Sequence, residues 1–316
     1  MNKLLVLTLM IVSCQTKETI NLDLSANPDD VELFSPDFIS TGLYERDMAI
    51  SPDGNELIYT IGNYDQSLRS LVMLKKEGEQ WSDKQLLSIS GRYNDIEPFY
   101  SFDGNQLYFA SDRPMDADTT RTDYNIWVSS RIDNSWSEPE PLDTIINTKG
   151  DEFYPSLSKY GNLFFTATRN DGIGREDIFI SKATNGSFEK PVVLDSTINT
   201  AVFEFNAYIN PDENLLIFSS YGREDGLGGG DLYYSQKDDN GHWTASKNLG
   251  NTFNSDKLDF CPFIDYANGN FYFSSTTSEA NTSQLETVEA FKAFANKPLN
   301  GMGNIYRISL ERLPFN

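Results

Sequence analysis

The chain contains 316 residues, of which 39% are hydrophobic and 13% aromatic, and its formal net charge is −22. This length and apolar content suit one large domain with a packed core, or two small ones. The negative charge disfavours nucleic acid and anionic lipid surfaces as ligands, and it leaves proteins, sugars and cations open. Two cysteines, Cys14 and Cys261, are too few for a disulfide framework.

The first 13 residues have the form of a bacterial signal peptide, since Lys3 precedes an apolar run that is too short to span a bilayer. Ile11-Val12-Ser13-Cys14 resembles the lipobox of bacterial lipoproteins, in which cleavage makes Cys the first residue and its thiol receives a diacylglyceryl group. The resemblance implies a lipid-anchored protein of the cell envelope, and Gln15 favours the outer membrane, on its periplasmic side or its surface. The alternative is an ordinary cleaved signal and a secreted protein. We expect residues 14–30, which are mostly polar, to form a flexible tether.

One pattern recurs in five stretches after residue 31: an acidic residue, a short apolar run, a turn and a second apolar run. The clearest copy is Asp95 to Arg113, reading DIEPFYSFDGNQLYFASDR, and the others begin at Glu45, Glu152, Glu204 and Asp259. Asp103-Gly104 between the two apolar runs predicts a hairpin with a two-residue turn. A unit of this size cannot bury its apolar face alone, so the repetition predicts a solenoid or a propeller.

Each unit carries a third apolar segment, such as Asn125-Ile126-Trp127, and a fourth that opens on an aromatic residue. A Ser or Asn stands five positions before each acidic residue, and the first such pair is Ser40 and Glu45. Residues 31–40 therefore resemble a fourth strand without its hairpin, and residues 304–310 a third strand without a fourth. We predict an all-β, five-bladed β-propeller over residues 31–316, built from four-stranded antiparallel blades and closed by the N-terminal strand, which completes the last blade.

The repeat resembles the TolB-like β-propeller family, whose unit has a WD-like motif around Pro-Asp-Gly and a following Leu-Tyr-Phe-Ala-Ser-x-Arg. Ser51-Pro52-Asp53-Gly54 and Leu107 to Arg113 carry this resemblance. The family includes periplasmic protein-binding subunits and domains fused to peptidoglycan-binding or hydrolase modules. The resemblance therefore implies the fold, and it leaves the function to be argued from the site.

An insertion at about residues 277–298 interrupts the last unit. Leu285, Val288, Phe291 and Phe294 recur at helical spacing, and Ser283 is a suitable N-cap with Glu286 three positions later. We expect a short helix over residues 284–295. It either covers the rim of the propeller or docks a partner.

The acidic residues that begin the units should form a ring near one mouth of the central channel, because the innermost strand of each blade lines that channel. They are Glu45, Asp95, Glu152, Glu204 and Asp259. Carboxylates facing one another would raise one another's pKa unless they are countered. We expect Arg113, Arg169 and Arg223 from neighbouring blades to pair with them, so that the ring stitches blade to blade. The alternative is a calcium ion held by the carboxylates, and no other cofactor is expected.

The second functional hypothesis is a glycan-active enzyme or glycan-binding protein that uses channel carboxylates, since glycoside hydrolases work with two of them. Asp47 and Glu97 are the extra carboxylates for that role. The single histidine, His242, lies in a turn, and no helix follows the glycine-rich run at residues 226–230, so neither a Ser-His-Asp site nor a phosphate cradle is expected. The sequence favours a monomeric, lipid-anchored binding or scaffold module without enzymatic activity, whose partner is an envelope protein or a glycan.

Overall fold

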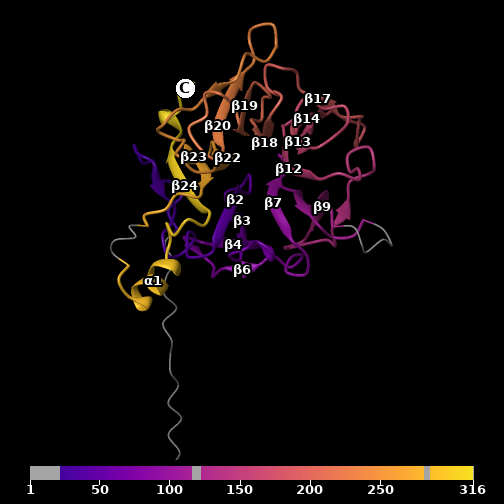
Figure 1. Cartoon of the computed structure of the whole chain (residues 1–316). Helices are drawn as coiled ribbons and strands as arrows, with labels where there is room; N and C mark the ends of the chain where they lie inside the picture. The colour runs from indigo at the N-terminus through magenta and orange to yellow at the C-terminus, as the bar shows by residue number, and fades with distance from the viewer. Residues whose placement is uncertain (1–21, 116–121, 281–284, 316) are drawn as a thin grey trace, which may run out of the picture.

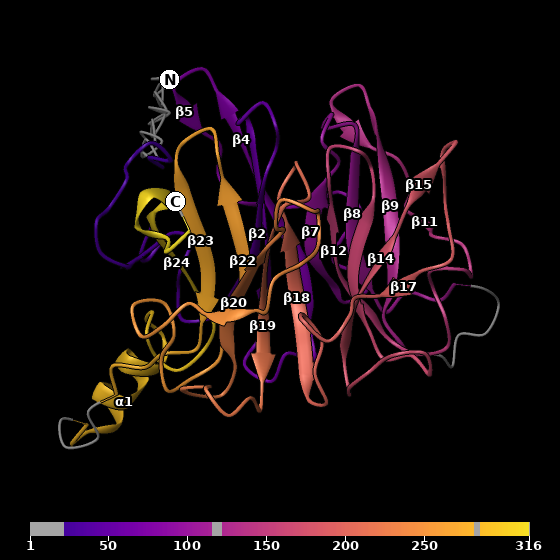
Figure 2. The same cartoon turned by 90° about the horizontal axis from the view of Figure 1, so that it is seen from above.

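Five antiparallel sheets surround a central axis in the structure, a computed structural model that describes residues 22–115, 122–280 and 285–315. Figure 1 shows the innermost strands β2, β7, β12, β18 and β22 gathered around the centre, and Figure 2 shows the strands along their length. The predicted all-β, five-bladed propeller is therefore confirmed.

The first two blades share one layout, in which the outermost strand is broken into two short pieces. Blade 1 contains β2 (Tyr44–Ile50), β3 (Glu56–Gly62), β4 (Arg69–Glu77), β5 (Gln80–Trp81) and β6 (Gln85–Leu86). Blade 2 contains β7 (Asp95–Tyr100), β8 (Gln106–Ser111), β9 (Asn125–Ile132), β10 (Ser135–Trp136) and β11 (Glu140–Pro141). The break follows the aromatic residue that was predicted to open the fourth strand, Trp81 or Trp136.

The remaining blades follow the same order from the axis outward. Blade 3 contains β12 (Glu152–Leu157), β13 (Leu163–Ala167), β14 (Asp177–Ser181) and β17 (Val192–Val193), with the small ladder of β15 (Ala183–Thr184) and β16 (Ser187–Phe188) beside it. Blade 4 contains β18 (Phe203–Ile209), β19 (Leu215–Tyr221), β20 (Asp231–Gln236) and β21 (Lys247–Asn248). Blade 5 contains β22 (Asp259–Asp265), β23 (Asn270–Ser275), β24 (Asn304–Ser309) and, as its outer strand, β1 (Glu32–Leu33).

The predicted clasp between the chain ends is present. β1 pairs antiparallel with β24, with Glu32 opposite Arg307 and Leu33 opposite Tyr306. Phe34, which is 1% exposed, continues this strand through a hydrogen bond from its N–H to the Ile305 carbonyl and packs edge-on against Tyr272. The first strand thus covers the edge of the last sheet, which would otherwise expose an unpaired ladder.

The Ser or Asn before each acidic residue ties the outer part of one blade to the third strand of that blade. The side chain of Asn199, for example, accepts a hydrogen bond from the Ile178 N–H at 2.8 Å and donates to the carbonyls of Ile178 at 3.0 Å and Leu194 at 2.8 Å. Asn147 makes the equivalent three bonds in blade 2. These amides replace ladder hydrogen bonds where the short outer strand ends, which explains why the position recurs.

The inner hairpins turn through longer loops than predicted. In blade 2 the Ser101 N–H bonds the Gln106 carbonyl, so four residues rather than two form the loop. Gly104 has a left-handed backbone with a φ of 72°, and Asp103 does not. The role of Asp103 is to accept hydrogen bonds from Ser101 Oγ and from the Asn105 N–H. The Asp-Gly pair thus marks the hairpin correctly, although only its glycine requires the left-handed conformation.

The apolar core lies between neighbouring blades. Ile58 and Leu71 of blade 1, for example, pack with Phe109, Trp127 and Trp136 of blade 2. Each buried aromatic or branched side chain contributes about 1.5–3 kcal/mol. The blades therefore stabilise one another face to face, which leaves the axis free for other side chains.

The chain packs against the fold earlier than predicted. Leu22 and Leu24 are buried, the Leu24 carbonyl accepts a hydrogen bond from Asn270, and the Pro28 carbonyl accepts one from the Ser309 N–H. Residues 22–30 therefore belong to blade 5 and not to a flexible tether, because their two leucines fill a gap in its apolar surface. The signal peptide and Cys14 lie outside the described residues.

The insertion in blade 5 forms α1 (Val288–Ala295), which is shorter than predicted and begins after Thr287. The Thr287 hydroxyl accepts a hydrogen bond from the Ala290 N–H, while the predicted cap, Ser283, lies outside the described residues. The helix stands away from the blades (Figure 1), and Val288 and Phe291 are 63% and 59% exposed. In the described ranges, no helix is long and apolar enough to cross a membrane.

Candidate functional site

The predicted ring of acids is buried, and each carboxylate is directed to the turn before its own strand. Glu45, Glu152 and Glu204 accept hydrogen bonds from the backbone N–H of the Thr four positions earlier at 2.9, 3.0 and 2.8 Å, and from the hydroxyl of the same Thr. Asp259 binds Ser255 in the same way. We had expected these acids to face one another across the channel. Their carboxylates instead bind the turns that connect neighbouring blades.

Blade 2 departs from this arrangement because Gly91 occupies the position of the Thr. Asp95 instead accepts hydrogen bonds from Ser111 Oγ at 2.6 Å and from the Arg113 guanidinium at 2.7 Å. The arginine thus compensates for the missing hydroxyl.

The three predicted arginines hold the same turns, but they come from the blade of the acid and not from a neighbour. Arg113, Arg169 and Arg223 each donate to a carbonyl of the preceding turn, those of Ile89, Ile146 and Ile198 respectively. Arg223 also pairs with Glu204 at 2.9 Å, whereas Arg169 pairs with Asp171 at 3.5 Å. The arginines therefore connect neighbouring blades indirectly, by binding the turn that joins them.

Burial sets the protonation of these acids. It raises the pKa of Glu152 to about 7 and that of Asp259 to about 6, and it also raises the pKa of Glu45 and Asp95. Mutual repulsion, the cause we predicted, is not the main one. Among the residues that the structure describes, no three His, Cys, Asp or Glu side chains are placed to hold a metal ion together, so the calcium alternative gains no support.

The residues at the axis are not the acids that begin the strands but the residues two positions later. Every innermost strand contains a β-bulge two positions after its acid, where two residues stand opposite one residue of the second strand. The first bulge residue has a left-handed backbone in all five blades, with φ between 49° and 61°: Asp47, Glu97, Tyr154, Asn206 and Cys261. None of them is glycine, so each conformation costs about 1–3 kcal/mol and must be held by its surroundings.

These five residues and Arg46 form what we call the axial cluster. Arg46 donates from Nε to Asp47 and from Nη2 to Glu97, both at 2.6 Å. Asn206 donates to Glu97 at 3.1 Å although it belongs to blade 4 and Glu97 to blade 2. Cys261 donates its thiol proton to Asp47 at 2.6 Å. The cluster thus links opposite blades and closes the channel.

The two carboxylates that the glycoside hydrolase hypothesis requires are fully engaged here. Both oxygens of Glu97 accept hydrogen bonds, one from Arg46 and Asn206 and the other from the Tyr154 N–H at 2.7 Å. Asp47 accepts from Arg46 and Cys261 on one oxygen and from the Glu97 N–H on the other. Burial raises the pKa of Glu97 to about 7 in spite of Arg46. Each carboxylate thus accepts three hydrogen bonds from neighbouring groups and holds them in place, which leaves at most one of its roughly four acceptor sites for a further donor.

Asp47 and Glu97 were singled out from the sequence, but the rest of the axial cluster was not. Asp, Glu, Tyr, Asn and Cys share no chemistry, so no residue type recurs at the bulge. The signal that could have revealed it is the proline that follows in three blades, at Pro98, Pro155 and Pro262. Proline cannot donate to a ladder and is found within strands mainly at edges and bulges.

The axial cluster separates two mouths. The first, which we call the arginine mouth, is a cavity of about 250 Å³ where the innermost strands begin. A collar of Ile96, Phe153, Phe205 and Phe260 surrounds it together with Arg46. Arg69, the first residue of β4, and Glu176, which directly precedes β14, also line it.

The second mouth, which we call the hairpin mouth, is a cavity of about 290 Å³ where the innermost strands end. Phe99, Tyr208 and Phe263 lie in a row there, with ring centroids 6.3 and 5.8 Å apart. Phe102 and Tyr266 stand at its edge and are 58% and 48% exposed. This surface is largely apolar.

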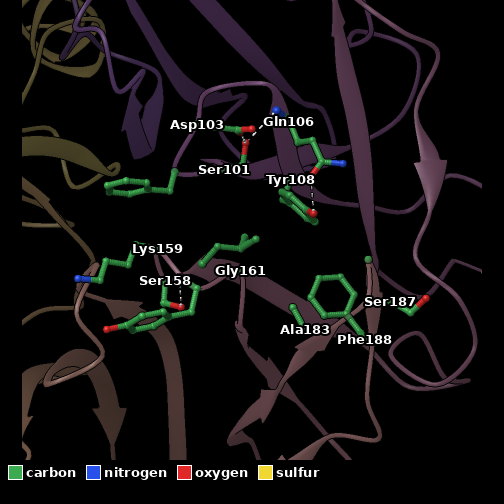
Figure 3. Close-up of a pocket in the computed structure, with 14 residues that line it drawn as sticks. Ser101, Asp103, Gln106, Tyr108, Ser158, Lys159, Gly161, Ala183, Ser187 and Phe188 are labelled. Carbon is green, nitrogen blue, oxygen red and sulfur yellow. Dashed lines mark hydrogen bonds between the residues drawn. The ribbon is translucent and has the colours of Figure 1, made fainter.

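A further cavity of about 470 Å³, the hairpin groove, runs between blades 2 and 3 on the same face (Figure 3). Tyr108 and Phe188 present their rings to it, and Gln106 lies on the wall above. The groove shares Phe102 and Leu157 with the hairpin mouth. The two cavities therefore adjoin at these residues, and we call the pair the hairpin depression.

Two other predicted features lie away from these cavities. The side chain of His242 is 80% exposed beside Asp238, as expected of a turn residue. The glycine-rich run lies in the loop before β20, where the Leu227 N–H donates to Asp231 at 2.5 Å, and no helix follows it.

Comparison with known proteins supports the fold. No protein-family model matches the chain, and no curated protein matches its sequence. Among solved structures, an α-L-arabinofuranosidase from Lactobacillus brevis is 10% identical, with 86% of this chain and 92% of that chain covered and a TM-score of 0.51. A structure described as a glycoside hydrolase is 9% identical, with 92% and 91% covered and a TM-score of 0.51.

A putative TolB from Agrobacterium tumefaciens is 14% identical, with 74% of this chain and 70% of that chain covered and a TM-score of 0.48. The chain spans only 54% of the TolB from Acinetobacter baumannii. These two similarities carry no argument about this chain, and its membership of the TolB-like family remains a prediction. The fold and the axial cluster define the chain as a five-bladed β-propeller whose channel is closed.

Proposed function

We propose that this protein is a non-catalytic binding module of the bacterial cell envelope, which holds an extended segment of another envelope protein. The observation that carries the proposal is the hairpin depression. In it the apolar hairpin mouth adjoins the hairpin groove, and exposed aromatic side chains line both cavities. Phe102, Tyr160 and Tyr266 are 58%, 60% and 48% exposed, which is unusual for aromatic rings without a partner.

The shape and charge of the depression favour a peptide segment with both apolar and basic side chains. Aromatic residues supply much of the binding energy at protein interfaces. The charged side chains along the depression are Asp103, Asp265 and Lys159, and Lys159 is already paired with Asp212. With a chain charge of −22, a basic partner is also attracted at long range.

The competing hypothesis of a glycan-active enzyme requires two carboxylates that can reach a sugar. The burial of Asp47 and Glu97 and the three hydrogen bonds that each accepts within the axial cluster count against it. Pairing with Arg46 and burial explain both residues without a substrate.

We further propose that a lipid on Cys14 attaches the module to the outer membrane. Cys14→Ser should move the protein from the membrane fraction to the soluble periplasmic fraction, while a conservative change at the neighbouring Ser13, Ser13→Ala, should leave it attached. Membrane attachment of Cys14→Ser through a retained apolar N-terminus would contradict the lipid anchor.

Site-specific photo-cross-linking in the native bacterium tests the binding surface. A photoreactive phenylalanine at Phe102 should give one recurrent protein adduct. The same residue at Tyr64, which is 81% exposed at the opposite end of the strands, should not. The adduct from position 102 should weaken when Tyr266 is changed to Ala. Equal adducts from both positions, or none from position 102, would contradict the assignment of the hairpin depression.

A further inference from the structure

The arginine mouth offers a second, chemically distinct cavity. Its volume of about 250 Å³ is below the range of about 300–1,000 Å³ that is usual for drug-sized ligands. It can therefore receive one small group or the tip of one side chain. Four aromatic residues, Tyr44, Phe153, Phe205 and Phe260, stand in its walls beside polar and charged side chains.

The two arginines at this mouth have partners within the fold, and Arg46 is the one whose partners are carboxylates. Arg46 makes ion pairs with both Asp47 and Glu97, so one cation stands against two carboxylates. Its guanidinium also lies over the Phe260 ring, 4.9 Å from the centroid. Arg69 donates to the Gln66 carbonyl at 3.0 Å and lies over the Tyr124 ring at 5.3 Å.

The Glu176 carboxylate differs from the other charged groups at this mouth. Glu176 lines the cavity and, within the described part of the chain, its carboxylate has no hydrogen-bond or ion-pair partner. Burial and the nearby Asp151 raise its pKa, which is the expected effect of an acid without a compensating cation. The carboxylates around the mouth thus outnumber the guanidinium groups.

The aromatic walls complete this environment. Arg46 and Arg69 lie over Phe260 and Tyr124, while Phe153 and Phe205 have no cation over their faces among the described residues. An aromatic face attracts a cation through its quadrupole, most strongly where water is excluded. An anion would be repelled by the excess of carboxylates, and a neutral group would leave Glu176 uncompensated.

We propose that the arginine mouth binds an organic cation, an ammonium or guanidinium group, which Glu176 pairs with and which Phe153 and Phe205 enclose. The group could belong to a free small molecule or to a Lys or Arg side chain of another protein. This site lies at the opposite end of the channel from the hairpin depression, so the inference does not rest on the proposed function.

Calorimetric titration of the full chain tests the proposal with matched probes. Choline and methylguanidinium should bind at least tenfold more tightly than 3,3-dimethylbutan-1-ol, the neutral isostere of choline. Acetate and arabinose should show no binding. If free choline binds more tightly than Nα-acetyl-lysine methylamide, the natural ligand is a small ammonium compound; the reverse order indicates a side chain of a protein.

Two variants and a control locate the site. Glu176→Gln should weaken choline binding about tenfold, and Phe205→Leu should weaken it severalfold because it removes the aromatic face and leaves the wall apolar. Glu140→Gln changes an exposed acid in β11 and should leave binding unchanged. Binding of the neutral alcohol or of arabinose as tight as that of choline, no cation binding at all, or an unaltered affinity in Glu176→Gln would overturn the proposal. Thermal unfolding of each variant checks that the fold is intact.

Discussion

Replacing Arg46 with methionine tests whether the axial cluster is structural. The substitution keeps an unbranched side chain of similar reach and removes the cation that pairs with Asp47 and Glu97 at 2.6 Å. Because the side chain of Arg46 is only 12% exposed and those of its partners 1% and 3%, solvent cannot compensate the two carboxylates. Removing one partner from such a buried group costs about 3–5 kcal/mol. We therefore expect Arg46→Met to lower the free energy of unfolding by about that amount at pH 7.

Urea unfolding followed by tryptophan fluorescence measures this loss. Arg131→Met is the matched control: Arg131 pairs with Glu56 at 2.8 Å but is 25% exposed, so its loss should cost about 0.2–1 kcal/mol. Without Arg46 the pKa of Glu97 rises further in the folded protein, so the folded state binds more protons than the unfolded state. The loss should therefore be larger at pH 8 than at pH 5. A loss below about 1 kcal/mol, or one that is equal at both pH values, would refute the reasoning.

Three further predictions concern the parts that surround the cluster. Asn199→Ala removes three buried hydrogen bonds around Ile178 and should cost about 2–4 kcal/mol in urea unfolding, whereas no loss would contradict the role given to this position. Phe34→Ala should lower the unfolding free energy by about 3 kcal/mol because the residue seals the clasp, while Phe102→Ala, at an exposed position, should change it little. Burial raises the pKa of Glu152 to about 7, so the folded protein retains a proton that the unfolded chain releases near pH 4.5, and stability falls as the pH rises through that window. The neutral Glu152→Gln should therefore flatten the dependence on pH between 5 and 8, by up to about 3 kcal/mol, and an unchanged slope would count against the shifted pKa.

The blades and their closure could be predicted from the sequence because each depends on a local, repeated signal. The acid at the start of a unit and the Ser or Asn five positions earlier recur because both satisfy backbone groups near the link between two blades: Glu204 binds the turn at Thr200, and Asn199 binds Ile178 of the third strand. The clasp followed from counting strands at the two chain ends, and β1 and β24 form it.

The axial cluster could be predicted only in part because it depends on the β-bulge, and no residue type recurs at the bulge position. The recurring acids looked like the channel lining, since they begin the innermost strands. The β-bulge places the residues two positions later at the axis instead, so Glu97 meets Asn206 across the channel. Arg46 supplies the positive charge that pairs with Asp47 and Glu97, and it has no counterpart in the other blades. A search for recurring residues does not detect a residue that occurs in one blade alone.

Structural channel carboxylates and binding without catalysis are the central features of the function proposed for this protein. The most direct measurement is the rate of hydrolysis of a panel of aryl glycosides, including arabinofuranosides, by the purified protein and by its Glu97→Gln variant. We predict no turnover above the uncatalysed rate for either protein. Turnover by the wild type that Glu97→Gln abolishes, in a variant that remains folded, would contradict the account and establish Glu97 as a catalytic residue.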